Sequence, residues 1–325
     1  MENRRKRRAA RFLAGAILLC TLAPAAAAPA SAVWVEIPPI TAARTIRTSV
    51  RPIVDAIRRA AVSGSISAGS WTEVPVIAHA MGTVEGRVGT NCKEAFLESY
   101  ARGQRVFEVD FQLTSDGVLV ARHDWGDNAN FNSEQSLEGV ADWSTFMSTP
   151  ICYYYEPLDI DGIMDLLQAY PDAYIVTDSK DTDEATVRAQ IREIVRAVDQ
   201  AGDPTLWKRI IVQIYHEEMF DWVREEAPVK NWIFTLYQIG EPDYDEIGRF
   251  CRERGIPVVT MDASRLTAKN SRTLHSYGCL VYVHTVNRLS SMAASSWEAD
   301  GYYSDCITPA QLMGVLSKTY GQYPR

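Results

Sequence analysis

The feature that most limits what this chain can fold into is a series of eight short apolar runs. They span residues 74–80, 106–113, 118–123, 174–179, 209–215, 232–237, 257–262 and 280–286. Stretches with the apolar spacing of helices lie between most of them, at 92–102, 160–170, 183–201, 217–226, 244–254 and 268–277. Strands that alternate with helices favour a parallel sheet joined by right-handed crossovers. Eight such strands over about 250 residues are typical of a TIM (β/α)8 barrel. Only residues 114–117 separate the second run from the third, so we expect the helix between those two strands to be missing.

The N-terminus has a different composition from the rest of the chain. Six Lys/Arg residues within the first eleven precede an apolar run from 12 to 28, and Ala30-Ser31-Ala32 fits a small-residue cleavage site. This layout predicts a secretory signal peptide at 1–32 and a secreted or periplasmic protein. The alternative is an uncleaved membrane anchor, which Pro24 and the alanine-rich end of the run disfavour. We expect a lead-in helix and linker at 33–73, followed by the barrel domain at 74–325.

The charge and cysteine content narrow the function classes. Cleavage after residue 32 leaves 27 basic and 40 acidic residues, a net charge of −13. This argues against a nucleic-acid partner and against binding to an anionic membrane by bulk charge. We also expect no stable membrane span after cleavage. Five cysteines remain, with no Cys-x-x-Cys spacing, which argues against a zinc site. We expect most of them to be small buried side chains, although export would permit disulfides.

Six polar side chains fall near the C-terminal ends of four predicted strands, where TIM barrels carry their catalytic groups. They are His79, Glu108, Asp110, His123, Asp178 and Lys180. Strand side chains alternate, so Glu108 and Asp110 point to one face and repel each other unless a cation lies between them. Mg²⁺ or Ca²⁺ is the natural occupant of such an oxygen site. Each residue alone has an ordinary structural explanation. Together they predict a metal-assisted site for phosphodiester cleavage, with two histidines available for proton transfer.

The sequence resembles one known family, the glycerophosphodiester phosphodiesterases, strongest from His79 to Asp124. The family belongs to a barrel superfamily shared with phosphatidylinositol phospholipases C and sphingomyelinase D-type phospholipases. The matching positions are Asn91, Ala95-Phe96, Glu108-Val109-Asp110, Thr114-Ser115-Asp116-Gly117, His123-Asp124, Thr285-Val286-Asn287 and Ala299-Asp300-Gly301-Tyr302-Tyr303-Ser304-Asp305. Four positions depart from the family pattern. Ala80 replaces an arginine, Thr90 an acidic residue, Asp178 a glutamate and His284 a tryptophan.

The resemblance implies hydrolysis of glycerophosphodiesters to glycerol 3-phosphate and an alcohol. It also implies acid and base roles for His79 and His123 and a phosphate contact from the matching Asn91. From their positions at the strand ends, we expect Glu108, Asp110 and Asp178 to hold one divalent cation, Mg²⁺ or Ca²⁺. For the same reason we expect Lys180 and His284 to contact the phosphate. Two other interpretations remain. One is a phospholipase D-like or sphingomyelinase D-like lyase acting on phospholipids, and the other is a non-catalytic barrel that binds a phosphorylated ligand.

Overall fold

The computed structural model describes residues 71–126, 135, 137 and 139–320. The predicted signal peptide at 1–32 and most of the predicted lead-in and linker at 33–73 lie outside these residues. Of the lead-in, residues Trp71–Glu73 form a turn of 3-10 helix. The buried Trp71 indole donates a hydrogen bond to the side chain of Asn231 at 3.2 Å. This short segment therefore covers the end of the barrel where the strands begin.

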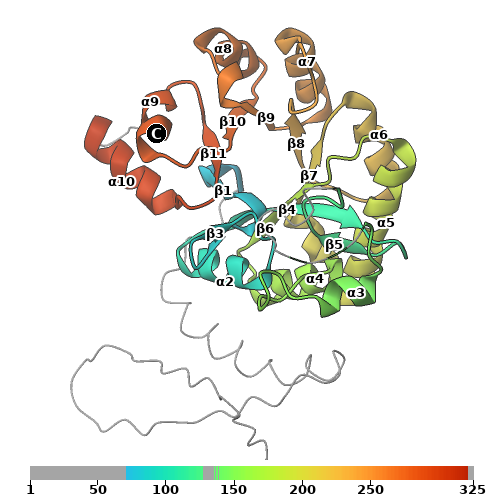
Figure 1. Ribbon diagram of the computed structural model, residues 1–325. Coiled ribbons are helices and arrows are strands. Elements are labelled where there is room, and N and C mark those ends of the chain that lie inside the picture. The colour runs from blue at the N-terminus through green and yellow to red at the C-terminus, as the bar shows by residue number, and fades with distance from the viewer. Residues whose placement is uncertain (1–70, 127–134, 136, 138, 321–325) are drawn as a thin grey trace, which may run out of the picture. The chain divides into compact units, whose positions relative to one another are not determined.

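Eight parallel strands form a closed barrel, which confirms the predicted TIM fold (Figure 1). They are β1 (Val76–Ala78), β4 (Val106–Leu113), β6 (Tyr174–Asp178), β7 (Ile210–Ile214), β8 (Asn231–Thr235), β9 (Val258–Asp262), β10 (Leu280–His284) and β11 (Gly301–Ser304). Each pairs with the next in this order, and β1 pairs with both β4 and β11, so the sheet has no open edge.

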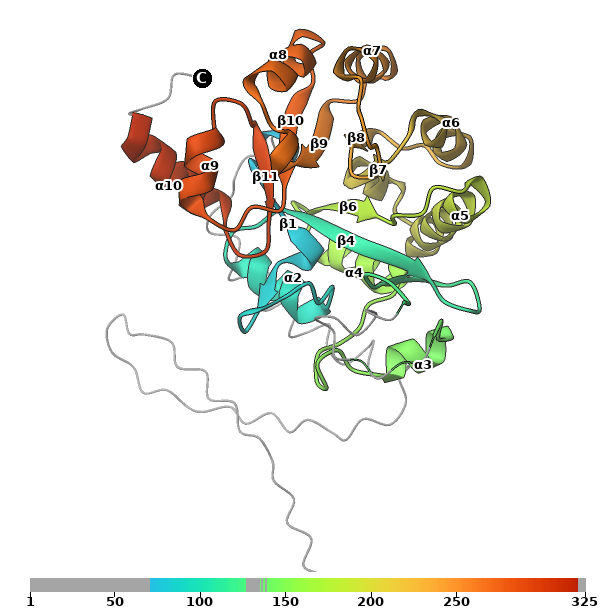
Figure 2. The ribbon, with the colours of Figure 1, turned by 45° about the horizontal axis from the view of Figure 1, so that its top comes forward.

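Helices lie outside the strands, as Figure 2 shows. They are α2 (Lys93–Ala101), α3 (Trp143–Ser148), α4 (Ile160–Ala169), α5 (Glu184–Ala201), α6 (Glu217–Glu226), α7 (Tyr244–Arg254), α8 (Ala268–Ser276), α9 (Leu289–Ser295) and α10 (Pro309–Tyr320). The six predicted helices are present within one residue at each end. Helix α5 shows why the prediction worked: Asp183 caps its first turn through Thr186, and Gly202 ends it in the left-handed conformation.

One predicted barrel strand is not part of the barrel. The run at 118–123 contains β5 (Leu119–Ala121), which pairs antiparallel with the outer end of β4. No helix separates β4 from β5, as expected, because four residues suffice for the turn of an antiparallel hairpin. The eighth barrel strand is β11 instead, within the segment that carries the family-like ending at 299–305. A second small hairpin, β2 (Thr83–Val84) with β3 (Arg87–Val88), follows β1.

The inside of the barrel changes from apolar to polar along the strands. One buried residue from each of the eight strands forms an apolar layer near the strand starts: Ile77, Val106, Val176, Ile211, Ile233, Val258, Tyr282 and Tyr303. Because side chains alternate, Glu108 and Asp110 point to the same side of β4 as Val106. Likewise, Asp178 points to the same side of β6 as Val176. The carboxylates therefore lie inside the barrel, above its packed floor.

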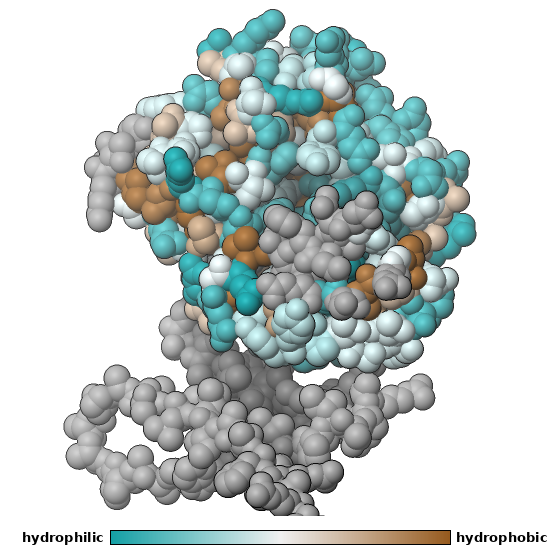
Figure 3. Space-filling view, viewed as in Figure 1, coloured by the Kyte–Doolittle hydropathy of each residue, from teal (hydrophilic) through white to brown (hydrophobic). Residues whose placement is uncertain are grey.

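One face of the barrel domain is mostly polar. On the face seen in Figure 3, hydrophilic residues predominate, and hydrophobic residues gather beside α9 and α10. Met313 of α10 has an exposed side chain. None of the helices in the described part of the chain has the length and apolar character needed to cross a membrane.

Candidate active site

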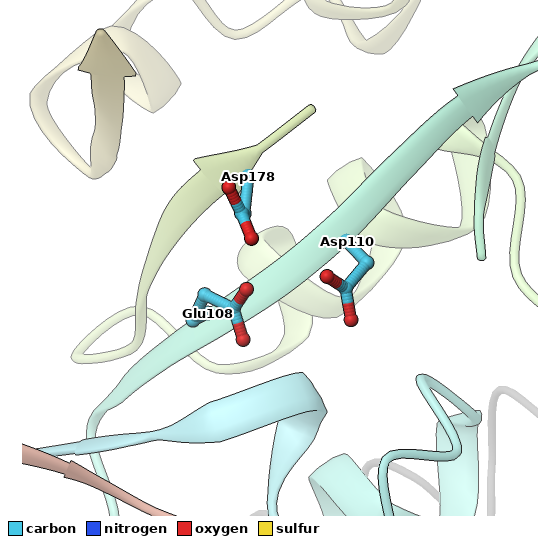
Figure 4. A group of neighbouring side chains, drawn as sticks. All are labelled: Glu108, Asp110 and Asp178. Carbon is cyan, nitrogen blue, oxygen red and sulfur yellow. The ribbon is translucent and has the colours of Figure 1, made fainter. Parts of the chain in front are cut away.

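Three carboxylates from two neighbouring strands converge inside the C-terminal end of the barrel. Glu108 and Asp110 come from β4 and Asp178 from β6, and Figure 4 shows them facing a common space. Asp110 and Asp178 are paired in the register of the two strands. One oxygen from each of the three residues lies within 4.8 Å of the others. Glu108 and Asp110 are each only 1% exposed, so they cannot rely on water to separate their charges.

Lys180 supplies a positive charge to this cluster. Its ammonium group binds Asp110 and also Asp178, the latter at 2.8 Å. Burial by itself would raise the pKa of Asp110, but Lys180, with smaller contributions from His79 and His123, lowers it to about 2. The sequence predicted that Lys180 would contact phosphate. The structure shows an ammonium bound to two of the three predicted metal ligands.

The backbone around Lys180 is held in an uncommon conformation. Its φ angle is 61°, in the left-handed region. Its N–H donates to the Tyr215 hydroxyl at 3.1 Å, and its carbonyl accepts from the Gln238 amide at 2.6 Å. These two contacts, one to each of the peptide groups that flank the Lys180 α-carbon, stabilise a turn that follows the end of β6.

Of the three carboxylates, Glu108 has the negative charge that its surroundings stabilise least. Burial, and next the charge of Asp110, raise its pKa well above the ordinary value. It accepts a hydrogen bond from the backbone N–H of Ala80 at 2.5 Å. Ala80 has a φ angle of 44°, so the turn after β1 is bent in a way that aims this N–H at the carboxylate. A proton or a cation at Glu108 would relieve the remaining repulsion.

His79 lies next to the cluster and is oriented by a fourth carboxylate. Its Nδ1 is 2.7 Å from Asp305, which follows β11. Asp305 in turn accepts from the Asn287 amide, and its backbone carbonyl accepts from Thr83 at 2.5 Å. Burial by itself lowers the pKa of His79, but Glu108, Asp305 and Asp110 outweigh it and raise the pKa to about 9. About a third of the His79 side chain remains exposed, which leaves it accessible to a substrate.

His123 forms a second pair of the same kind. Its Nδ1 is 2.6 Å from Asp124, and its side chain is 54% exposed. The hairpin of β4 and β5 positions it, because Arg122 donates its N–H to the carbonyl of Asp110 at 2.9 Å. The residue after Arg122 therefore lies close enough to Asp110 to lower the pKa of that carboxyl. Both histidines thus have Nδ1 bound to a carboxylate, which leaves Nε2 as the atom for proton transfer.

Asn91 has a structural contact where the resemblance implied a phosphate contact. Its amide nitrogen donates to Asp110 at 2.8 Å, and its amide oxygen accepts from the Asp110 N–H at 3.0 Å. It is 1% exposed and has a φ angle of 53°. Asn91 therefore orients Asp110. Gln213 plays the same part for Asp178, donating at 3.0 Å, and its own oxygen accepts from the Tyr303 hydroxyl at 3.0 Å.

His284 lies at the end of β10, which is separated from β4 by β1 and β11 around the barrel. Its Nε2 is buried and makes no hydrogen bond among the residues that the structure describes. Burial lowers its pKa, which favours the neutral imidazole. Its ring centroid is 5.9 Å from that of the exposed Tyr237. These contacts place His284 at the rim of the barrel. Its contact with phosphate stays a prediction.

The donor set fits the divalent cation that the sequence predicts. All three candidate ligands, Glu108, Asp110 and Asp178, offer carboxylate oxygens, which Mg²⁺ and Ca²⁺ prefer. Two of the three are buried, and among the described residues no cationic side chain forms a hydrogen bond with Glu108. A divalent ion would supply the missing positive charge.

Comparisons with solved structures identify the architecture. A phosphodiesterase from Oleispira antarctica, solved with its product sn-glycerol-3-phosphate, matches at a TM-score of 0.60 and 14% identity, covering 75% of this chain and 97% of that one. This chain has the fold of the glycerophosphodiester phosphodiesterases. One such enzyme, from Parabacteroides distasonis, matches at a TM-score of 0.59 and 17% identity, covering 76% of this chain and 98% of that one. A candidate glycerophosphoryl diester phosphodiesterase from Silicibacter pomeroyi matches at a TM-score of 0.63 and 18% identity. The match covers 77% of this chain and 95% of that one. No family model matches the sequence.

Sequence reasoning missed the groups that orient the histidines. Asp305 lies almost 230 residues from His79 along the chain and contacts it at 2.7 Å. The Gly-x-x-x-Asp ending at 301–305 was the available signal, and it was used only to recognise the family pattern. Asp124 was part of a matched motif, but its contact with His123 was not foreseen.

Proposed function

We propose that this chain is an exported, divalent-metal-dependent phosphodiesterase that hydrolyses glycerophosphodiesters to glycerol 3-phosphate and an alcohol. The observation that carries the proposal is the pair of carboxylate-oriented histidines beside the buried Glu108–Asp110–Asp178 cluster. Supporting it, proteins of the same fold are phosphodiesterases, and one was solved with glycerol 3-phosphate. The proposed cation is Mg²⁺ or Ca²⁺.

The reaction requires that the negative charge on the phosphate oxygens be neutralised. It also requires two proton transfers, one from the attacking group and one to the leaving oxygen. The bound cation would supply Lewis acidity and orient the phosphate. Glu108, Asp110 and Asp178 would hold it, with Asn91 and Gln213 keeping two of these carboxylates in place.

The histidines would carry the protons. One Nε2 accepts a proton from the attacking group, and the other donates one to the leaving oxygen. The attacking group is water, or a hydroxyl of the substrate that forms a cyclic phosphate which water then opens to glycerol 3-phosphate. Asp305 and Asp124 keep each ring in the tautomer and orientation that the transfer requires. In this proposal His79 and His123 are the catalytic residues, and the two aspartates position them.

The test is an assay of the purified protein with glycerophosphocholine and, separately, with a lysophospholipid, each with and without divalent metal. Phosphorus NMR identifies the product. Metal-dependent release of glycerol 3-phosphate supports the proposal. Formation of a cyclic phosphate from the lysophospholipid would instead support the lyase. Binding of either compound without turnover would instead support a non-catalytic barrel.

Export is a separate part of the proposal and rests on the N-terminal sequence. The basic residues, the apolar run and the small-residue site predict cleavage after Ala32. Mass spectrometry of the protein recovered from outside the cytoplasm should show a chain that begins at Val33. A chain that retains the apolar run would support the membrane-anchor alternative.

A further inference from the structure

The residue before the exposed His123 is a buried arginine. Arg122 is 3% exposed, whereas the side chain of His123 is 54% exposed. Burial lowers the pKa of Arg122 to about 10, so the guanidinium still carries its charge at neutral pH. A buried charge destabilises a fold unless it is hydrogen-bonded. The contacts of this guanidinium therefore indicate which part of the structure it supports.

The guanidinium binds the loop that carries the histidine. Its Nε donates to the backbone carbonyl of Asp124 at 2.8 Å, so the side chain reaches past His123 to the next residue. The carboxylate of Asp124 has two more contacts: Oδ2 lies 2.6 Å from Nδ1 of His123, and Oδ1 accepts from the N–H of Gly126 at 2.9 Å. These three contacts fix the orientation of Asp124. Of the three partners, only Arg122 is buried.

Other groups hold the guanidinium itself in place. Its Nη1 donates to the side-chain oxygen of Gln135, which is 1% exposed and whose amide donates to the carbonyl of Thr149 at 2.6 Å. The guanidinium carbon also lies over the Trp125 ring, 4.7 Å from its centroid, which is a cation–π contact. The Trp125 indole donates to the carbonyl of Leu113, the last residue of β4, at 2.9 Å. Because a guanidinium is planar and rigid, these contacts set the direction of its Nε–H.

The backbone of Arg122 links the same residue to the carboxylate cluster. Its N–H donates to the carbonyl of Asp110 at 2.9 Å, which continues the pairing of β4 with β5. Arg122 is thus joined to Asp110 through its backbone and to Asp124 through its side chain. His123 lies between Arg122 and Asp124 in the chain, so these two contacts determine where it is held relative to the candidate metal ligands.

We propose that Arg122 is a positioning residue for His123. By holding the carbonyl of Asp124, the guanidinium keeps the Asp124 carboxylate on Nδ1 of His123. A carboxylate only accepts hydrogen bonds, so Nδ1 of the neutral ring carries the proton and Nε2 is left free. A neutral imidazole in water carries its proton mainly on Nε2, so the loop imposes the less common tautomer. The effect of Arg122 on turnover rests on the proposed function, whereas its effect on the tautomer does not.

The first test is nitrogen NMR of the histidine rings in the purified protein, with His123 assigned by comparison with His123→Ala. At a pH where this ring is neutral, the wild type should show the proton on Nδ1. Arg122→Met keeps a long side chain but has no donor, so the signals should move to those of the Nε2-protonated form. A ring that stays protonated on Nδ1 in Arg122→Met would overturn the proposal.

Turnover provides the second measurement. Arg122→Met should lower kcat on the order of 10²-fold with little change in KM, because misplacing a reacting group by about 1 Å has an effect of this size. Combined with His123→Ala it should cause no further loss, because a positioning residue acts only through the group that it positions. An unchanged kcat in the single variant, or a full additional loss in the double variant, would contradict the proposal.

Arg122→Lys keeps the proposal testable if Arg122→Met folds poorly. Lysine retains the buried positive charge but cannot make the two directed contacts of the guanidinium. We expect the same change of tautomer and a lower kcat in this variant. Wild-type values of both in Arg122→Lys would show that the charge alone suffices and that the proposed hydrogen bond to Asp124 does not position the histidine.

Arg209→Met is a matched control. Arg209 is half-buried just before β7, at the end of the barrel away from the carboxylates, and its guanidinium also donates to backbone carbonyls, among them that of Leu167 at 2.6 Å. Its loss should lower the melting temperature but leave kcat and the tautomer of His123 unchanged. The same changes in Arg209→Met as in Arg122→Met would mean that both act through a general loss of stability.

The two measurements also separate this proposal from the proposed function. If the wild type hydrolyses no phosphodiester, the proposed function fails, and the tautomer of His123 still decides whether Arg122 positions it. If the wild type is active and Arg122→Met has wild-type kcat, the positioning role alone fails.

Discussion

Replacing Lys180 by methionine removes a cation that is bound directly to two carboxylates of the cluster. In the metal-free protein, this leaves three carboxylates with oxygens within 4.8 Å of each other and two of them almost fully buried. Removing one partner of a buried ion pair costs about 3–5 kcal/mol. The buried carboxyls can recover part of this by binding a proton, so we expect a loss of about 3 kcal/mol. The melting temperature of the metal-free protein should fall by roughly 6–12 °C.

The same change should strengthen metal binding. In the wild type, an incoming cation must share Asp110 and Asp178 with the ammonium of Lys180, whereas in the variant these oxygens are available. We expect the dissociation constant for the divalent ion to fall at least about tenfold, which corresponds to about 1.4 kcal/mol. Added metal should therefore raise the melting temperature of the variant more than that of the wild type. Differential scanning calorimetry and titration calorimetry measure both effects.

Lys93→Met is a matched control. Lys93 binds Glu156 at 2.8 Å, a separation like that of Lys180 from Asp178, but Glu156 is more than half exposed. An exposed pair contributes about 0–1 kcal/mol. If Lys180→Met melts no lower than Lys93→Met without metal, or binds metal more weakly than the wild type, the ammonium does not have the role described.

Turnover at saturating metal then tests the phosphate contact: a loss equivalent to about 2–4 kcal/mol in kcat/KM indicates that Lys180 also stabilises the transition state.

Three further predictions concern the rest of the site. His79→Ala and His123→Ala should each lower kcat by roughly 10²–10⁴-fold in protein that remains folded by circular dichroism, and near-normal turnover would remove that residue from the mechanism. Glu108→Gln should weaken divalent-metal affinity, and chelation should abolish turnover, whereas full activity after exhaustive chelation would favour a metal-free reaction. NMR titration of the metal-free protein should give His79 a pKa of about 9. The contribution of protonated His79 to the stability of the fold should be complete below pH 6.5, the ordinary pKa of histidine, and should be lost as the pH rises through 9. Loading the metal should lower that pKa, because Glu108 and Asp110 would then be neutralised; an unchanged pKa would place the cation elsewhere.

A histidine outside the site provides the control for these substitutions. His275, in the last turn of α8, also contacts an aspartate, Asp300, at 2.8 Å, although through Nε2 rather than through Nδ1. Asp300 also accepts from the N–H of Val281 near the start of β10, at the end of the barrel away from the carboxylates. His275→Ala should therefore leave kcat unchanged. A loss similar to that of His79→Ala would mean that the substitutions act through general disruption.

The barrel could be predicted because its signals are local. Apolar runs and helical spacing depend on residues within one or two turns of each other, and caps such as Asp183 mark helix ends. The error at 118–123 has a physical cause: three buried residues in extended conformation look alike in a parallel and an antiparallel strand. The direction of pairing depends on the partner strand, which the local pattern does not contain.

The candidate site was predictable in composition and less so in its contacts. Strand alternation placed Glu108 and Asp110 on one face, and the ends of strands indicated His79 and Asp178. The contact of Lys180 with both aspartates depends on a left-handed turn after β6 that Tyr215 and Gln238 stabilise from other strands' loops. Such contacts between distant segments leave no periodic signal in the chain.

The antiparallel hairpin explains how one barrel presents two oriented histidines. The ring of parallel strands supplies His79 through β1 and its aspartate through β11, which are neighbours in the sheet. The second histidine comes from outside that ring: β4 continues beyond the barrel, and β5 returns along it until Arg122 pairs with Asp110. The next residue, His123, thus lies close enough to the same carboxylate cluster to lower the pKa of Asp110. The short turn at 114–117, which removes a helix from the regular pattern, is therefore what brings a second candidate proton-transfer group near the carboxylates that adjoin His79.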